Sequence, residues 1–183
     1  MSSPTATSQA YRAHILDPAC DYLAPNILNS LSLETIPKPI PGPGSVLVRI
    51  RRAVTLNFRD ILIAVGSPLY PIPALDGIIP CADGAGEIVG VGENSTWSHH
   101  IGQNVIVVPQ KTWIDGDIAS YGGECMGGGS MNGTHVQYVA MPDECVIPMP
   151  KNITFGETAS LVVAGVTAMN VLSTVEVKRG RRW

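Results

Sequence analysis

The chain has 183 residues, which is enough for one domain with a sizeable hydrophobic core. Hydrophobic residues make up 45% of it and charged residues 15%, and this balance excludes an intrinsically disordered protein. The net charge is −3, the sequence has no long basic cluster, and no apolar run reaches the length of a membrane span, so neither nucleic acid nor a membrane is expected as a partner.

The first part of the chain predicts a tail, two short strands and a turn-rich link. Residues 1–10 predict a disordered tail without the apolar segment of a signal peptide, so we expect a cytoplasmic protein. Tyr11–Leu16 and Leu31–Ile36 predict the first two strands. The prolines and glycines of Pro37–Gly44 predict a series of turns. Val46–Ile50 then alternates apolar and basic residues, which is typical of a half-buried strand.

The middle of the chain predicts a helix, a loop and a turn that leads into a strand. Leu56–Val65 predicts a short helix with Asn57 as its cap. The proline-rich segment Gly66–Pro80 predicts a long ordered loop, and such loops often carry function. The closely spaced glycines of Gly84–Gly86 predict a turn, and Glu87–Val91 predicts the strand that follows it.

The next segments complete a mainly β pattern. Val105–Val108 predicts a strand, and the glycine-rich segment Lys111–Gly133 predicts a flexible loop. Thr134–Met141 and Cys145–Ile147 predict the last strands. Many short strands separated by glycine and proline turns indicate a closed or nearly closed β-barrel, which we assign to residues 11–153.

The C-terminal part changes from strands to a helix. Thr154 and Glu157 have the spacing of a capping box, in which each side chain bonds a backbone N–H that the helix leaves unpaired. The apolar residues that follow predict a mostly buried helix up to Ser173. Val175–Gly180 then resembles the beginning of another strand. We assign residues 154–183 to a linking helix and the truncated start of a further domain.

Two motifs carry a resemblance to a known family. Residues 56–60 read L-N-F-R-D, and residues 83–92 read D-G-A-G-E-I-V-G-V-G. In this order the motifs resemble the medium-chain dehydrogenase/reductase superfamily, in its zinc-independent branch of quinone oxidoreductases and enoyl reductases, and the similarity extends from Pro37 to Val177. The resemblance implies a GroES-like barrel. It also implies hydride transfer from NADPH to the activated C=C or C=O of an enone, quinone or carbonyl substrate.

The resemblance also bears on zinc. Zinc-dependent relatives have ligands at the positions of Asn57, Ala82 and Ala164, and zinc requires about four N, S or O ligands. Their structural zinc site needs four cysteines, of which only Cys125 is present here. We therefore predict neither a catalytic nor a structural zinc ion.

Without a metal, hydrogen bonds must polarise the substrate carbonyl. Asn57 and Tyr70 are the candidate catalytic residues. The alternatives are that Asn57 only caps a helix and that the Tyr70 ring only packs in its loop. The resemblance implies that Asn57, Phe58 and Thr167 contact the cofactor, although a helical threonine such as Thr167 also bonds to its own preceding turn.

Three neighbouring residues are predicted to have structural roles. We expect Arg59 and Asp60 to brace the loop through a local ion pair and Asp83 to fix the turn at Gly84–Gly86. Cys81 has no adjacent cation in the sequence to lower its pKa, so we expect it to pack in the core.

No glycine-rich dinucleotide-binding loop follows Val177. We therefore expect this chain to be the N-terminal part of a two-domain oxidoreductase and to be inactive alone. The alternative is a non-catalytic GroES-like barrel that binds a partner or an apolar ligand. In either case the apolar helix after Thr154, if exposed, predicts association into a homo-oligomer.

Overall fold

The computed structural model describes residues 6–14, 31–54, 58–65, 67–70, 72, 75–110, 117 and 125–174. In chain order the elements are β1 (Thr7–Ala13), β2 (Leu31–Pro37), β3 (Ser45–Val54), α1 (Phe58–Ala64), β4 (Asp83–Val91), β5 (Asn104–Val107), β6 (Tyr138–Pro142), a 3₁₀ turn (Asp143–Cys145), β7 (Val146–Pro148), α2 (Phe155–Leu161) and α3 (Val163–Thr174).

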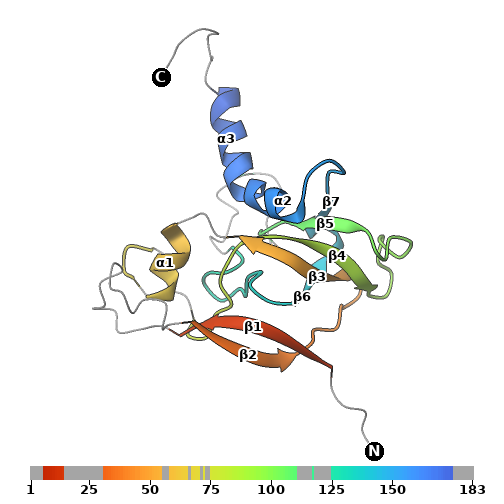
Figure 1. The fold of residues 1–183 in the computed structure, drawn as a ribbon, viewed down its shortest axis with the longest axis horizontal. Coiled ribbons are helices and arrows are strands. Elements are labelled where there is room, and N and C mark those ends of the chain that lie inside the picture. Colours follow the sequence, from red (N-terminus) through yellow and green to blue (C-terminus); the bar gives the residue numbers. More distant parts are fainter. Residues whose placement is uncertain are drawn as a thin grey trace, which may run out of the picture.

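The described strands form two antiparallel sheets, as Figure 1 shows. The larger sheet has five strands in the order β6-β3-β4-β5-β7, and the smaller one pairs β1 with β2. The smaller sheet contacts the segment just before β6, where the Tyr11 N–H donates to the His135 carbonyl at 3.0 Å. The described part of the chain is thus mainly β with helices at its C-terminal end, as predicted.

The beginning of β1 corrects the prediction of a disordered tail over residues 1–10. Within the described part of the chain, the strand starts at Thr7 and pairs along its whole length with β2, from Thr7 opposite Pro37 to Ala13 opposite Leu31. Ser8 and Ala10 are buried in this arrangement. The start of this strand is polar, so the sequence pattern did not predict it. The strand is ordered by its pairing with a distant segment and has no apolar pattern of its own.

The predicted turn at Gly84–Gly86 is wrong, because these residues lie within β4 and pair with both β3 and β5. The glycines are needed because the backbones come close together. A Cβ on Gly86 would lie 2.2 Å from the Arg49 carbonyl oxygen, and one on Gly84 would lie 2.9 Å from Thr134 Cγ2. The glycine spacing therefore marks tight packing in a strand.

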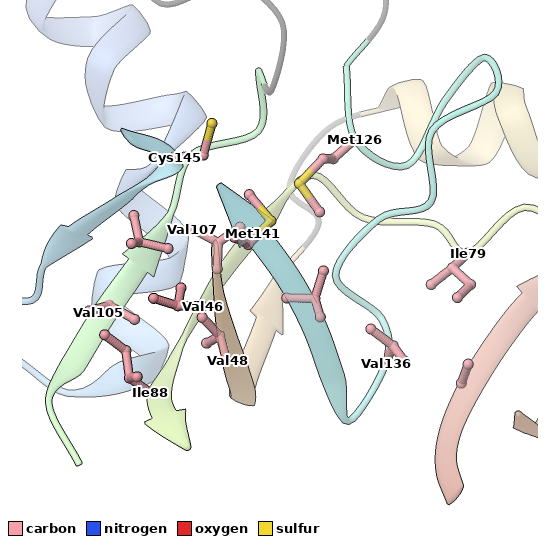
Figure 2. Close-up of a cluster of buried hydrophobic side chains, with 13 residues drawn as sticks. Val46, Val48, Ile79, Ile88, Val105, Val107, Met126, Val136, Met141 and Cys145 are labelled. Atoms are coloured by element: carbon pink, nitrogen blue, oxygen red, sulfur yellow. The ribbon is translucent and has the colours of Figure 1, made fainter. Parts of the chain in front are cut away.

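The main core lies against the five-stranded sheet. Figure 2 shows side chains from β3, β4, β5 and β6 converging with side chains from the connecting segments. Burial of such side chains is the main stabilising contribution to the fold. The residues of this cluster are Ala10, Val46, Val48, Ile79, Ile88, Val105, Val107, Met126, Val136, Val139, Met141, Cys145 and Val146.

The predicted C-terminal helix is two helices. The capping box is confirmed, since the Glu157 N–H donates to Thr154 Oγ1 at 3.3 Å and the Thr154 N–H donates to Glu157 Oε2 at 2.8 Å. The axis bends by 50° between α2 and α3. The prediction of a mostly buried helix is wrong for α3, which extends away from the sheet (Figure 1) and leaves Val166 and Met169 68% and 65% exposed.

No single helix in the described residues is long and apolar enough to cross a membrane. Taken together α2 and α3 reach that length and composition, with the 50° bend between them.

A cluster of charged side chains ties the smaller sheet to the turn at residues 75–78. His14 Nε2 lies 2.9 Å from Glu34 Oε1, and His14 Nδ1 lies 3.6 Å from Asp76 Oδ2. Arg12 Nε is 3.1 Å from the second Glu34 oxygen. The hydrogen bond to Glu34 is the main cause that raises the pKa of His14 above its ordinary value of 6.5.

This cluster predicts a small pH dependence of stability. Because the pKa of His14 is higher in the folded state, its contribution is fully present below about pH 6.5 and is lost as the pH rises through the folded pKa. The groups are largely exposed, so we expect less than about 1 kcal/mol between pH 6 and pH 8. Urea unfolding at the two pH values should show this loss in the wild type and not in His14→Gln. An equal pH dependence in both proteins would contradict it.

Candidate active site

The helix α1 follows β3 in the chain, and its side chains bond to the segment just before β4. Asp60 is buried, and its Oδ1 accepts a hydrogen bond from the Cys81 N–H at 3.1 Å. Arg59 reaches in another direction and donates to the Met126 carbonyl at 2.5 Å. The two residues therefore hold different segments.

Tyr70 completes this arrangement. Its ring packs on the buried cluster that includes Ile63 and Ile78, and its hydroxyl and Arg59 Nη2 both lie close to the backbone of Gly128. Arg59 Nη1 also lies 3.7 Å from Cys125 Sγ. The alternative of a packing role for Tyr70 is thus correct for the ring, and the hydroxyl belongs to a polar group at the junction of three segments.

The third segment, residues 125–133, lies directly on the backbone of Cys81. A Cβ on Gly133 would lie 2.0 Å from the Cys81 carbonyl oxygen, and one on Gly127 would lie 2.7 Å from it. Burial is the main cause that raises the pKa of Cys81 to about 12, so its thiol stays protonated at neutral pH. This agrees with the predicted packing role of Cys81.

The prediction that Asp83 fixes a turn is wrong, because its side chain caps a helix. Its Oδ1 accepts a hydrogen bond from the Val163 N–H at 2.8 Å, and Val163 is the first residue of α3. Helix N-termini leave such N–H groups unpaired, so Asp83 joins β4 to α3. Burial raises the pKa of Asp83, and the Val163 hydrogen bond partly opposes that shift.

Removing this cap should destabilise the protein. We expect Asp83→Ala to lower the free energy of unfolding by about 1–3 kcal/mol, because the Val163 N–H loses its acceptor. Asp83→Asn keeps an oxygen in the same place and carries no charge to bury, so it should remain within about 1 kcal/mol of the wild type. Thermal and urea unfolding of both variants measure this difference, and equal losses would show that the hydrogen bond is not the stabilising contact.

The candidate cofactor residues lie on two elements. Phe58 begins α1 and is 50% exposed. Thr167 lies one turn into α3, where its exposed hydroxyl donates to the Val163 carbonyl at 2.8 Å, as the alternative interpretation predicted. Asn57 lies outside the described residues. Asp83 positions the helix that carries Thr167.

Sequence reasoning missed the contact between Arg59 and the segment that contains Gly128. A Cβ on Gly128 would lie 3.1 Å from Arg59 Nη2 and 3.2 Å from the Tyr70 hydroxyl. The run of three glycines at 127–129 was the available signal, since glycine often marks a close approach of backbone to other groups. Of the positions where zinc-dependent relatives have ligands, the described ones are Ala82 and Ala164, and the described residues contain no group of three or more metal-binding side chains.

Comparison with known proteins now identifies the family. Residues 42–151 match the alcohol dehydrogenase GroES-like domain. The chain belongs to this family. The expected membership in the medium-chain dehydrogenase/reductase superfamily is thereby confirmed.

Individual relatives support the same assignment. The chain is 36% identical over 131 residues to a zinc-type alcohol dehydrogenase-like protein of Schizosaccharomyces pombe, covering 72% of this chain and 37% of the relative. It is 30% identical over 155 residues to a trans-enoyl reductase of Aspergillus flavipes, covering 84% and 40%. The fold of 2R,3R-butanediol dehydrogenase from Bacillus subtilis matches with a TM-score of 0.75 at 20% identity, covering 96% and 49%. The chain thus spans less than half the length of these relatives.

Proposed function

We propose that this chain provides the substrate-side domain of a zinc-independent, NADPH-dependent oxidoreductase that reduces an activated C=C or C=O bond. The observation that carries the proposal is the place of the Tyr70 hydroxyl, which lies beside Gly128 and near Arg59 where α1, the 67–70 turn and the 125–133 segment meet. A phenolic O–H is a suitable donor to a carbonyl oxygen, because it stabilises the negative charge that develops there during reduction. Asn57 is the second candidate donor.

Residue chemistry supports zinc independence. Alanine offers no ligand atom at positions 82 and 164, and Asn57 supplies at most one weak oxygen donor. Hydrogen-bond donors would then polarise the substrate carbonyl, as zinc does in the zinc-dependent members of the family. Elemental analysis of the purified protein tests this directly. We expect far less than one zinc per chain, and stoichiometric zinc would overturn this part of the proposal.

The residues fit a nicotinamide contact but not a complete cofactor site. Phe58 and Thr167 are both exposed and offer a ring face and a hydroxyl. Bound NADPH would supply the hydride. The described residues contain no glycine-rich turn between a strand and a helix to hold its pyrophosphate. We therefore propose that a polypeptide of these 183 residues binds NADPH weakly and turns over slowly at most.

The test of the proposed reaction compares two preparations. The native protein from its source cells should oxidise NADPH in the presence of cyclohex-2-enone or a quinone, followed by absorbance at 340 nm. The polypeptide of 183 residues should be much slower under the same conditions. No oxidation by the native protein would contradict the oxidoreductase assignment. Fast, steady oxidation by the 183-residue polypeptide would contradict its expected inactivity.

A second candidate function is favoured by the exposed face of α3. Val166, Met169 and Leu172 of α3 are each more than half exposed, and so is Leu161 at the end of α2. Below them, apolar residues of β5, β7 and α2 line a cavity of about 490 Å³. Such a patch is typical of an association surface, so the alternative is a non-catalytic barrel that binds a partner or a second copy. Light scattering after size exclusion, with a dye that reports apolar surface, tests it, and a monomer that binds little dye would count against it.

A further inference from the structure

An open groove of about 620 Å³ is lined by the smaller sheet, by β3 and by residues 134–137 between them. It shares no residue with the junction described above. Its floor is a run of hydrogen-bonded backbone, because β1 pairs with β2, the Gln137 N–H donates to the Gln9 carbonyl at 2.8 Å, and the Ile50 N–H donates to the Gln137 carbonyl at 2.9 Å. The segments therefore cross the groove in the order β2, β1, 135–137 and β3.

Two consecutive arginines of β3 line this groove because the strand is irregular at that point. Successive side chains of a regular strand point to opposite faces, which would separate Arg51 from Arg52. In the pairing of β3 with β4, however, Ile50 is opposite Gly86 and Arg52 is opposite Ala85, so Arg51 is an extra residue. A β-bulge of this kind re-aims side chains and is frequent beside functional sites. Both arginines line the groove as a result.

The positive charge of the groove is only partly neutralised. Arg51 Nη2 lies 2.8 Å from Glu87 Oε2, which pairs this arginine with a residue outside the groove. Arg52 is exposed, and its Nη1 donates to the Arg51 carbonyl at 2.8 Å. No ion pair joins Arg52 to a carboxylate in the described part of the chain, and none of the described lining residues is acidic. Since a guanidinium has five N–H donors, Arg52 retains donors for an anionic group.

The remainder of the groove offers apolar and aromatic surface. The Tyr11 and His135 rings stack with their centroids 4.4 Å apart. Leu33 is opposite Tyr11 in the next strand and is 56% exposed. Neighbouring strands lie about 4.8 Å apart, so β2 and β3 are separated by about 14 Å across the groove. The chemistry therefore changes in one direction, from the apolar Leu33 through the ring stack to the cationic Arg52.

We propose that this groove binds an amphipathic organic anion, whose carboxylate pairs with Arg52 and whose apolar body lies over the Tyr11–His135 stack and Leu33. The order of the segments sets this orientation, because the cation and the apolar side chain lie at opposite ends of the groove. A rigid carboxylate with two aromatic rings has the required shape. The inference goes beyond the proposed function, since it needs neither a cofactor nor turnover.

The test uses biphenyl-4-carboxylate as the probe, with the neutral biphenyl-4-methanol and the small anion acetate as matched controls. Each compound is titrated into the ¹⁵N-labelled 183-residue protein, and the amide signals are followed by NMR. We expect biphenyl-4-carboxylate to cause saturable shifts at Tyr11, Leu33, Ala53 and His135. Each control should bind at least about tenfold more weakly, because it lacks one of the two kinds of contact.

Variants at exposed positions separate the two contacts. Arg52→Gln should weaken binding of biphenyl-4-carboxylate by about tenfold, and Arg52→Lys should restore part of that loss. Arg49→Gln removes an exposed arginine of the same strand that does not line the groove, so it should leave the affinity unchanged. Leu33→Ala should weaken binding of the biphenyl probe severalfold and have no effect on acetate.

Three results would overturn the proposal. The first is equal affinity for biphenyl-4-carboxylate and biphenyl-4-methanol, or no binding of either. The second is an Arg52→Gln variant, folded by its amide spectrum, that binds the probe as tightly as the wild type. The third is a set of shifts confined to α3, which would place the probe on the exposed apolar residues of that helix. None of these results bears on the proposed function, which is tested by NADPH oxidation and by enone binding at the other site.

Discussion

Gly86→Ala is expected to destabilise the protein by about 3 kcal/mol or more. The added Cβ would lie 2.2 Å from the Arg49 carbonyl oxygen and 2.9 Å from Val48 Cγ1, and both belong to the neighbouring strand β3. A carbonyl within a paired strand cannot move aside as a flexible side chain can. The two strands would have to separate at the point where β4 pairs with both of its neighbours.

The measurement is urea unfolding followed by circular dichroism, with Gly90→Ala as the matched control in the same strand. A Cβ on Gly90 meets Leu47 Cβ at 3.5 Å, which is ordinary van der Waals contact. Gly90→Ala should therefore stay within about 1 kcal/mol of the wild type. If both variants lost the same stability, the close approach at Gly86 would not be the cause.

Ile88→Ala is the second large effect, with an expected loss of about 3–4 kcal/mol. Ile88 is fully buried in the middle of β4, and Figure 2 shows it within the cluster that includes Val48 and Val105. Removing its branched side chain leaves a cavity between strands that are held in register on both sides. The core therefore cannot collapse to fill the space, and both the transfer free energy and the packing contacts are lost.

Ile147→Ala in β7 is the control for this prediction. Its side chain is 46% exposed, so the same substitution should cost less than about 1 kcal/mol. The free energy of unfolding of the two variants, measured under identical conditions, gives the comparison. A loss for Ile88→Ala no larger than that for Ile147→Ala would contradict the position of the core.

Local patterns predicted the elements that depend on local physics. The alternation in Val46–Ile50 indicated β3, and the spacing of Thr154 and Glu157 indicated the start of α2, because side-chain periodicity and helix capping are set by neighbouring residues. The glycines of Gly84–Gly86 misled the prediction because a close approach between strands produces the same composition as a turn. The break between α2 and α3 had no proline or glycine at Val162 to mark it.

Local sequence patterns predicted even less of the candidate site than of the fold. The L-N-F-R-D motif and Tyr70 were the candidates that the sequence offered, and of the two roles considered for Tyr70 the structure shows the packing of its ring. The partners of Arg59 and Asp83 could not be predicted, because Met126 and Val163 lie 67 and 80 residues away in the chain. Only the folded sheet brings these segments together, and nothing in the sequence near Arg59 specifies a carbonyl as its partner.

The central claim is that the junction of α1, the 67–70 turn and the 125–131 segment is the place where a carbonyl substrate binds. Amide NMR of the labelled 183-residue protein, titrated with cyclohex-2-enone, tests it most directly. We predict saturable shifts at Phe58, Tyr70 and Gly128, with the signals of Thr7 and Ser8, at the end of β1 away from Ala13, unchanged. No saturable shift, or shifts confined to residues away from this junction, would contradict the account.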